Sequence, residues 1–128
     1  MSDTVEFPAM RANVIDALRS LADRAHQESS WGVYNEETGR YEDLSLCVNI
    51  LYDCQVLPRP AVAVGSVLVA SELGALRRLS DQLDPLVEEL GAAPDAVYLA
   101  DFRWPRVIEA SGEALAAMNG DGQGGSLG

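Results

Sequence analysis

A long run of leucines at helical spacing is the feature that most constrains the fold of this chain. Between Ser71 and Gly91, apolar side chains recur every three or four residues, the period that places them on one face of an α-helix. Ser71 is a suitable N-cap and Gly91 a natural C-terminal stop. Pro85 removes one backbone hydrogen bond inside the stripe, so we expect a kink or two abutting helices. The stripe consists of Leu73, Leu76, Leu79, Leu83, Leu86, Val87 and Leu90.

Helices are also predicted near both ends of the chain. Apolar residues follow helical spacing from Pro8, which suits a first helical turn, to about Ala22. Residues 23–30 add a further turn or two, and a final helix is expected from about Pro105 to Met118. These helices therefore frame the middle of the sequence.

The middle of the sequence changes to the two-residue period of a strand. Leu44, Leu46, Val48 and Ile50 alternate with polar or small residues, which predicts a strand over 44–52 with one buried face. The valine-rich segment 61–69, with Gly65 inside it, predicts a second strand that is bent or bulged. Further strands could lie at 32–41, around a hairpin tip at Thr38-Gly39, or at 96–99.

This order of elements predicts an α+β fold. A small antiparallel or mixed sheet of two to four strands would be packed by about three to four helices in two layers. The 128-residue chain suits one domain, which we place at residues 8–118. We expect a frayed N-terminus at 1–7 and a disordered tail at 119–128, which contains five glycines.

The charge balance narrows the choice of partners. The chain has 20 acidic residues against nine arginines and no lysine, a net charge of −11. Such a charge repels nucleic acids and anionic membrane surfaces, so we expect neither as a partner. It favours a basic protein, or it serves only to keep the chain soluble. No signal peptide and no run of 18 apolar residues is seen, so the expected location is the cytoplasm.

No motif in the sequence carries a recognisable chemistry. Cys47 and Cys54 lie seven residues apart, on opposite faces of the predicted strand, so we expect free thiols. His26 is the only histidine, and no partner for it can be placed nearby, so we interpret it as a partly exposed residue at a helix end. One histidine and two distant cysteines do not make a zinc site. We therefore assign no catalytic residue, no metal ligand and no cofactor, and we consider catalysis the less favoured reading.

One acidic cluster is a candidate recognition surface. Its four core members flank a central Gly39-Arg40, and a fifth acid, which either extends the surface or caps a turn, follows the predicted strand. The cluster can be read as a binding surface for a basic partner or as a solvated loop. Its members are Glu36, Glu37, Glu42, Asp43 and Asp53.

Several short motifs resemble a family of short proteins from Streptomyces and related actinobacteria. They run from the first predicted helix to the last, and the resemblance covers most of residues 8–118. It implies a cytoplasmic protein of unassigned role and supplies no site residues. The motifs are Pro8-Ala9-Met10-Arg11-Ala12-Asn13-Val14, Asp43-Leu44, Val48-Asn49-Ile50-Leu51-Tyr52-Asp53, Val64-Gly65-Ser66-Val67-Leu68, Tyr98-Leu99-Ala100-Asp101 and Trp104-Pro105-Arg106-Val107.

Three functional hypotheses remain at this point. The leading one is a non-catalytic protein-binding module, for example an immunity- or antitoxin-like protein that neutralises a basic toxin. The second is a small-molecule binder or minor enzyme with a pocket between sheet and helices. The third is a homo-oligomeric subunit in which strand 44–52 pairs with its own copy. The residues that could line the pocket are Asn49, Tyr52, Asp53, and either Trp31 or Trp104.

Overall fold

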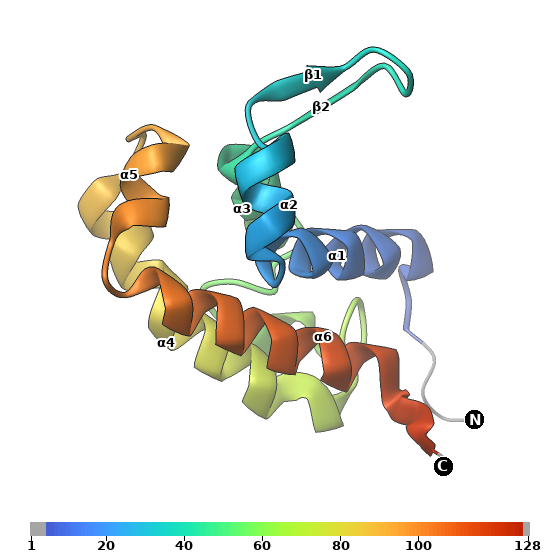
Figure 1. The fold of residues 1–128 in the computed structure, drawn as a ribbon. Helices are drawn as coiled ribbons and strands as arrows, with labels where there is room; N and C mark the ends of the chain where they lie inside the picture. The colour runs from blue at the N-terminus through green and yellow to red at the C-terminus, as the bar shows by residue number, and fades with distance from the viewer. Residues whose placement is uncertain (1–4, 127–128) are drawn as a thin grey trace.

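The computed structural model describes residues 5–126, and it describes their side chains except those of Asn35, Arg40 and residues 120–126. The described chain is mainly helical, with one small antiparallel hairpin (Figure 1). The prediction of an α+β chain is confirmed only in this broad sense. The elements are α1 (Pro8–Leu21), α2 (Arg24–Ser30), β1 (Val33–Asn35), β2 (Arg40–Glu42), α3 (Leu44–Asp53), η1 (Pro60–Ala63), η2 (Ala70–Glu72), α4 (Leu73–Leu90), α5 (Asp95–Ala100) and α6 (Trp104–Ser126).

The body of the molecule is built from its three longest helices and α3. α4 and α6 lie side by side, and α1 packs against both α6 and α3 (Figure 1). Their facing sides bury leucines of α1 and α4 together with Trp104, which is fully inaccessible to solvent. This core buries the apolar faces of the amphipathic helices seen in the sequence, because each such face packs against another helix.

The helices expected at 8–22 and 23–30 are confirmed as α1 and α2. α4 also follows the predicted stripe and ends at Gly91, where φ is +54°. It runs unbroken through Pro85, so the alternative of two abutting helices is wrong. Pro85 is exposed, whereas Leu83 and Leu86 on either side are buried. The packing of its neighbours therefore holds the helix together across the missing hydrogen bond.

The strand predicted at 44–52 is wrong, because this segment is the helix α3. Its buried residues are Leu44, Cys47, Val48 and Leu51, which follow the helical spacing i, i+3, i+4, i+7. Leu46, which the strand pattern buries, is 42% exposed. Because α3 is a helix, it has no strand edge, so the proposed self-pairing of this segment as a strand is also wrong. Both cysteines are buried free thiols, Cys47 within α3 and Cys54 directly after it.

The second predicted strand, at 61–69, is wrong as well. Pro60 begins the short 3-10 helix η1, and Gly65 then turns the chain with φ of +97°. The backbone N–H groups of Val67 and Leu68 both reach the carbonyl of Ala63, which makes a compact turn and not an extended ladder. The segment 96–99 lies inside α5 and is therefore helical.

The only sheet among the described residues is the hairpin β1–β2, which confirms the expected hairpin around Thr38-Gly39. Each strand has three residues, so the sheet is too small to form a layer under the helices, and the two-layer arrangement is not seen. The hairpin instead projects from the helical body beside α2 and α3 (Figure 1).

The two predicted terminal tails stay predictions. Residues 1–4 and 127–128 lie outside the described part of the chain. Within it, the backbone N–H groups of Glu6 and Phe7 donate to the carbonyls of Gly65 and Ser66. α6 continues past Met118, where the sequence pattern placed its end, to Ser126.

Candidate functional site

The projecting hairpin presents two aromatic side chains to solvent. Tyr34 and Tyr41 are direct cross-strand partners, so both lie on the same face of the ribbon. They are 59% and 52% exposed, although most large apolar side chains of this chain are buried. Gly39 closes the turn with φ of +69°, and the position of its missing Cβ lies 3.8 Å from the Tyr34 hydroxyl oxygen. The hairpin therefore displays an aromatic pair directly beside its turn.

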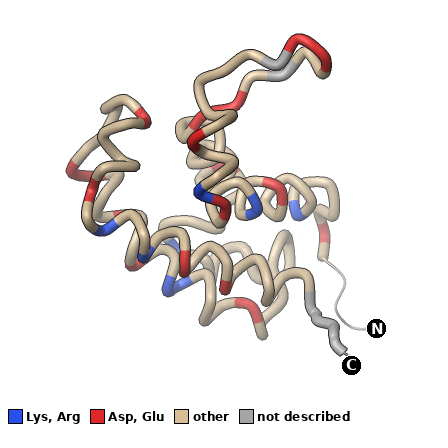
Figure 2. Tube along the Cα trace, viewed as in Figure 1, with Lys and Arg blue, Asp and Glu red and all other residues tan. Residues whose placement is uncertain are grey.

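Two of the five predicted site residues lie at the tip of this hairpin. Glu36 and Glu37 belong to the exposed turn between β1 and β2, and Figure 2 shows the tip as an acidic segment. They lie within a few residues of Tyr34 and Tyr41 along the two strands. The tip is thus an exposed surface that combines aromatic area with negative charge.

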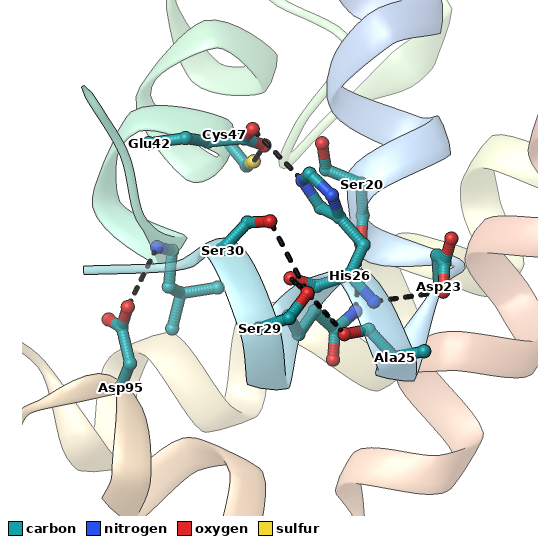
Figure 3. Close-up of polar contacts among 11 residues, drawn as sticks. Ser20, Asp23, Ala25, His26, Ser29, Ser30, Glu42, Cys47 and Asp95 are labelled. Carbon is teal, nitrogen blue, oxygen red and sulfur yellow. Dashed lines mark hydrogen bonds and ion pairs between the residues drawn. The ribbon is translucent and has the colours of Figure 1, made fainter. Parts of the chain in front are cut away.

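Glu42, the third predicted residue, turns toward the body and not toward solvent. It lies at the end of β2, where its Oε1 is 3.0 Å from Nε2 of His26 on α2. The thiol of Cys47 on α3 donates to its Oε2, at 3.4 Å. Figure 3 shows Glu42 between these side chains, with Ser20 beside them. The carboxylate therefore fastens the base of the hairpin to α2 and α3.

The electrostatics of this cluster favour a structural role. Burial acts to raise the pKa of Glu42, but hydrogen bonds from Ser20, His26 and Cys47 outweigh it and hold that pKa below its usual range. Burial, followed by the nearby charge of Glu42, raises the pKa of the Cys47 thiol far above its usual range. A thiol that stays protonated is a poor nucleophile. The Cys47–Glu42–His26 arrangement therefore lacks an activated nucleophile.

The last two predicted residues lie at opposite ends of α3. Asp43 is its N-cap, and its carboxylate accepts from the backbone N–H of Leu46 at 2.9 Å. Asp53 is the last residue of α3, about 15 Å away along the axis at 1.5 Å per residue. The predicted acidic cluster is thus divided into an exposed tip, two residues bound within the fold and one remote acid.

Two of the residues expected to line a ligand pocket share a hollow, although it does not lie between a sheet and helices. Asn49 and Tyr52 line a hollow of about 170 Å³ among α3, the end of α4 and α5. Tyr98 of α5 completes it, whereas Asp53 and the two tryptophans do not line it. Trp31 and Trp104 are buried instead and meet edge to face, with ring centroids 6.2 Å apart.

Within residues 5–126, no three histidine, cysteine or acidic side chains are placed so that they could share a metal ion. In the same part of the chain, no helix has both the length and the apolar character needed to cross a bilayer.

Comparison with known families gives one match. A family model described as "Domain of unknown function (DUF7945)" covers residues 5–124. The chain belongs to this family. No curated protein and no solved structure matches it. The match is consistent with the resemblance to an uncharacterised family, while its actinobacterial origin and cytoplasmic location stay predictions.

Within this DUF7945 domain, no sequence pattern indicates the pairing between His26 and Glu42. The two residues are 16 positions apart and are joined only because the hairpin folds back on α2. The sequence gives a weak indication of the exposed tyrosines, because they flank the predicted turn at positions 34 and 41. Neither feature could be located without knowing how the hairpin packs.

Proposed function

We propose that this chain is a non-catalytic protein-binding module whose hairpin tip recognises a basic protein. The observation that carries the proposal is the exposed pair Tyr34 and Tyr41 beside Glu36 and Glu37, on an element that projects from the body. Tyrosine is enriched in binding interfaces because its ring supplies contact area while its hydroxyl remains hydrated. An immunity- or antitoxin-like role is one form that such a module can take.

The charge of the chain supports a basic partner. A surface potential of one sign steers an oppositely charged protein toward its binding site and speeds association. The net charge of −11 supplies the overall attraction, and the acidic tip would orient the partner over the tyrosines. The tyrosine pair would then slow dissociation, because apolar contact in the centre of an interface contributes most of the binding energy.

The way the hairpin is held also favours recognition. Glu42 fixes its base through His26 and Cys47, while the turn remains exposed. An element that is anchored at one end loses less conformational freedom on binding than a loose loop does. This is the reason for placing recognition at the tip and not at Glu42 or Asp43.

The test compares three versions of the tagged full-length chain as bait in a lysate of the source organism. They are the wild type, a tip variant Glu36→Lys/Glu37→Lys, and the variant Tyr34→Ser/Tyr41→Ser. We expect the wild type to capture a protein of high isoelectric point, and to lose it as salt is raised. Association of that purified protein with the tip variant should be roughly tenfold slower at low salt, whereas the tyrosine variant should mainly dissociate faster.

Asp53→Lys is the matched control, because it reverses an exposed acid on α3 far from the tip. This variant should capture about as much of the basic protein as the wild type does. The hairpin is not the recognition element if the tip variant and the tyrosine variant both capture the same proteins as the wild type. The same conclusion follows if Asp53→Lys weakens capture as much as they do.

A further inference from the structure

A hollow beside α4 brings two arginines together. It has a volume of about 390 Å³ and lies between α4 and the segment 58–61. Arg59 comes from that segment and Arg77 from α4, and both side chains are exposed. Asp81, one turn after Arg77, also lines the hollow. Two cations and one anion thus face a single space in a chain that is strongly acidic overall.

These two arginines differ from most others in the described structure. Arg11, Arg19, Arg24, Arg78 and Arg103 each pair with a carboxylate. Within residues 5–126, Arg59 and Arg77 form no ion pair and no side-chain hydrogen bond. This is unexpected, because 20 acids are available and Asp81 lies at the i+4 position from Arg77, where an ion pair forms readily.

Arg106 is also without such a bond among the described residues, but its surroundings are different. It lines a neighbouring hollow of about 360 Å³ with Arg78, where three acids outnumber the two arginines. Those acids are Asp81, Glu109 and Glu113. The hollow beside Arg59 is therefore the one of the two with an excess of positive charge.

The fold fixes Arg59 in place beside α4. Pro58 and Pro60 flank it, and a residue that precedes proline is restricted to extended conformations, as its φ of −125° and ψ of 84° show. The hydroxyl of Ser80 on α4 lies 3.0 Å from the carbonyl of Pro58. Pro60 is buried on the other side. The backbone that carries Arg59 is thus held before any ligand arrives, which lowers the entropic cost of binding.

We propose that this hollow binds a small molecule through an oxyanion, a phosphate or carboxylate group, held between the guanidinium groups of Arg59 and Arg77. Guanidinium groups present several N–H donors in a plane that matches these oxyanions. The volume is at the low end of ordinary ligand pockets and excludes a large ligand. Asp81 opposes a bare anion and would instead accept a hydrogen bond from a hydroxyl or amino group elsewhere on the ligand.

The overall negative charge does not prevent such binding. At physiological ionic strength, charges more than about 8 Å away are largely screened. A small ligand therefore responds to the two arginines that line the hollow more than to the distant hairpin. This inference does not depend on the proposed function of the hairpin.

The test is a titration of the full-length chain with inorganic phosphate, phenyl phosphate and acetate, followed by calorimetry at constant ionic strength. We expect saturable binding of at least one of these probes. Arg59→Gln and Arg77→Gln should each weaken it by about tenfold or more, while Asp81→Asn should strengthen the binding of inorganic phosphate. Arg106→Gln is the matched control and should change affinity much less than either of the first two variants.

The opposite directions expected for Asp81→Asn and the two arginine variants separate a binding site from a loss of folding, which would weaken binding in every variant. A preference for the two phosphates over acetate would identify phosphate as the bound group, and the reverse order would identify carboxylate. Absence of saturable binding by all three probes, or equal affinities in all four variants, would overturn the proposal.

Discussion

Gln27 joins α2 to both α1 and α6 through one buried amide. Its Nε2 donates to the carbonyls of Ser20 and Leu21, both at 2.9 Å, and its Oε1 accepts from the indole Nε1 of Trp104 at 3.0 Å. The residue is 1% exposed, so water cannot replace these partners. A buried amide with every partner in place stabilises the fold and also selects one arrangement of the helices.

Gln27→Leu should therefore be strongly destabilising, although it changes the side-chain volume little. It leaves the Trp104 indole N–H and the Leu21 carbonyl buried without partners, and each such group costs about 1–3 kcal/mol. We expect the free energy of unfolding to fall by at least about 2 kcal/mol, measured by urea denaturation. Gln82→Leu on α4, which is only partly buried, is the control and should stay within about 0.5 kcal/mol. Equal losses in the two variants would show that the amide network contributes little.

Glu42 predicts how the stability of the hairpin base depends on pH. Its pKa in the folded chain lies below the usual value, so the folded state binds its proton less readily than the unfolded state does. The stabilisation that the Glu42 carboxylate gives the folded state is therefore fully present above the unfolded pKa of about 4.3. It is lost as pH falls through the lower folded pKa.

The measurement compares the wild type with Glu42→Gln in urea titrations from pH 6 to pH 2. The wild type should be the more stable protein at pH 6, and its advantage should shrink as the solution becomes acid. Asp101, whose pKa is lowered to about 2 by Arg103, is present in both proteins and cancels in the difference. A difference that stays constant across this range would mean that the Glu42 carboxylate has no net attraction for its partners.

At the scale of elements, α3 shows why a two-residue period can mislead. The residues 44–51 fit both alternation and the helical spacing of Leu44, Cys47, Val48 and Leu51. Ten residues is long for a strand and ordinary for a helix. Asp43, three residues before Leu46, is an N-cap that the acidic-cluster interpretation assigned to a partner instead. The length of the segment and its N-cap therefore indicated a helix, whereas the apolar alternation wrongly favoured a strand.

This capping role gives a prediction for the two ends of α3. Asp43→Ala removes the acceptor for the Leu46 N–H and should lower the free energy of unfolding by about 1 kcal/mol. Asp53→Ala, at the negative end of the helix dipole, should cost nothing or stabilise slightly. Both variants are compared by thermal and urea denaturation. Equal effects would show that the two carboxylates act only through the overall charge and not through the helix ends.

The candidate site could be predicted only where it is local in the sequence. The hairpin followed from Gly39 and its polar neighbours, and Glu36 and Glu37 lie at its exposed tip as a turn requires. The division of the remaining acids could not be predicted, because it depends on His26 approaching from α2. The hollow beside Arg59 and Arg77 depends in the same way on contact between segments 18 residues apart.

At the scale of the whole molecule, the helices were predictable and their arrangement was not. Amphipathic stripes identify α1, α4 and α6 because each buries one face. One contact that joins distant parts of the chain is an ion pair between Arg11 and Glu72, which are separated by 61 positions. No local pattern marks these two residues, and the sequence offers 20 acids as partners for Arg11.

This ion pair supports the last prediction. Arg11 donates to Glu72 at 2.8 Å, to the carbonyl of Val67 at 3.0 Å and to that of Met118 at 2.9 Å, and so connects α1, the turn before α4, and α6. The Glu72 side chain is 3% exposed, so Arg11→Met leaves a buried charge unpaired. Removing one partner of such a pair costs about 3–5 kcal/mol, whereas replacing both can be nearly neutral. We therefore expect Arg11→Met/Glu72→Met to be more stable than Arg11→Met alone in urea denaturation. The reverse order would mean that the unpaired Glu72 carboxylate costs little and that the hydrogen bond it accepts from the Val69 N–H still stabilises the fold.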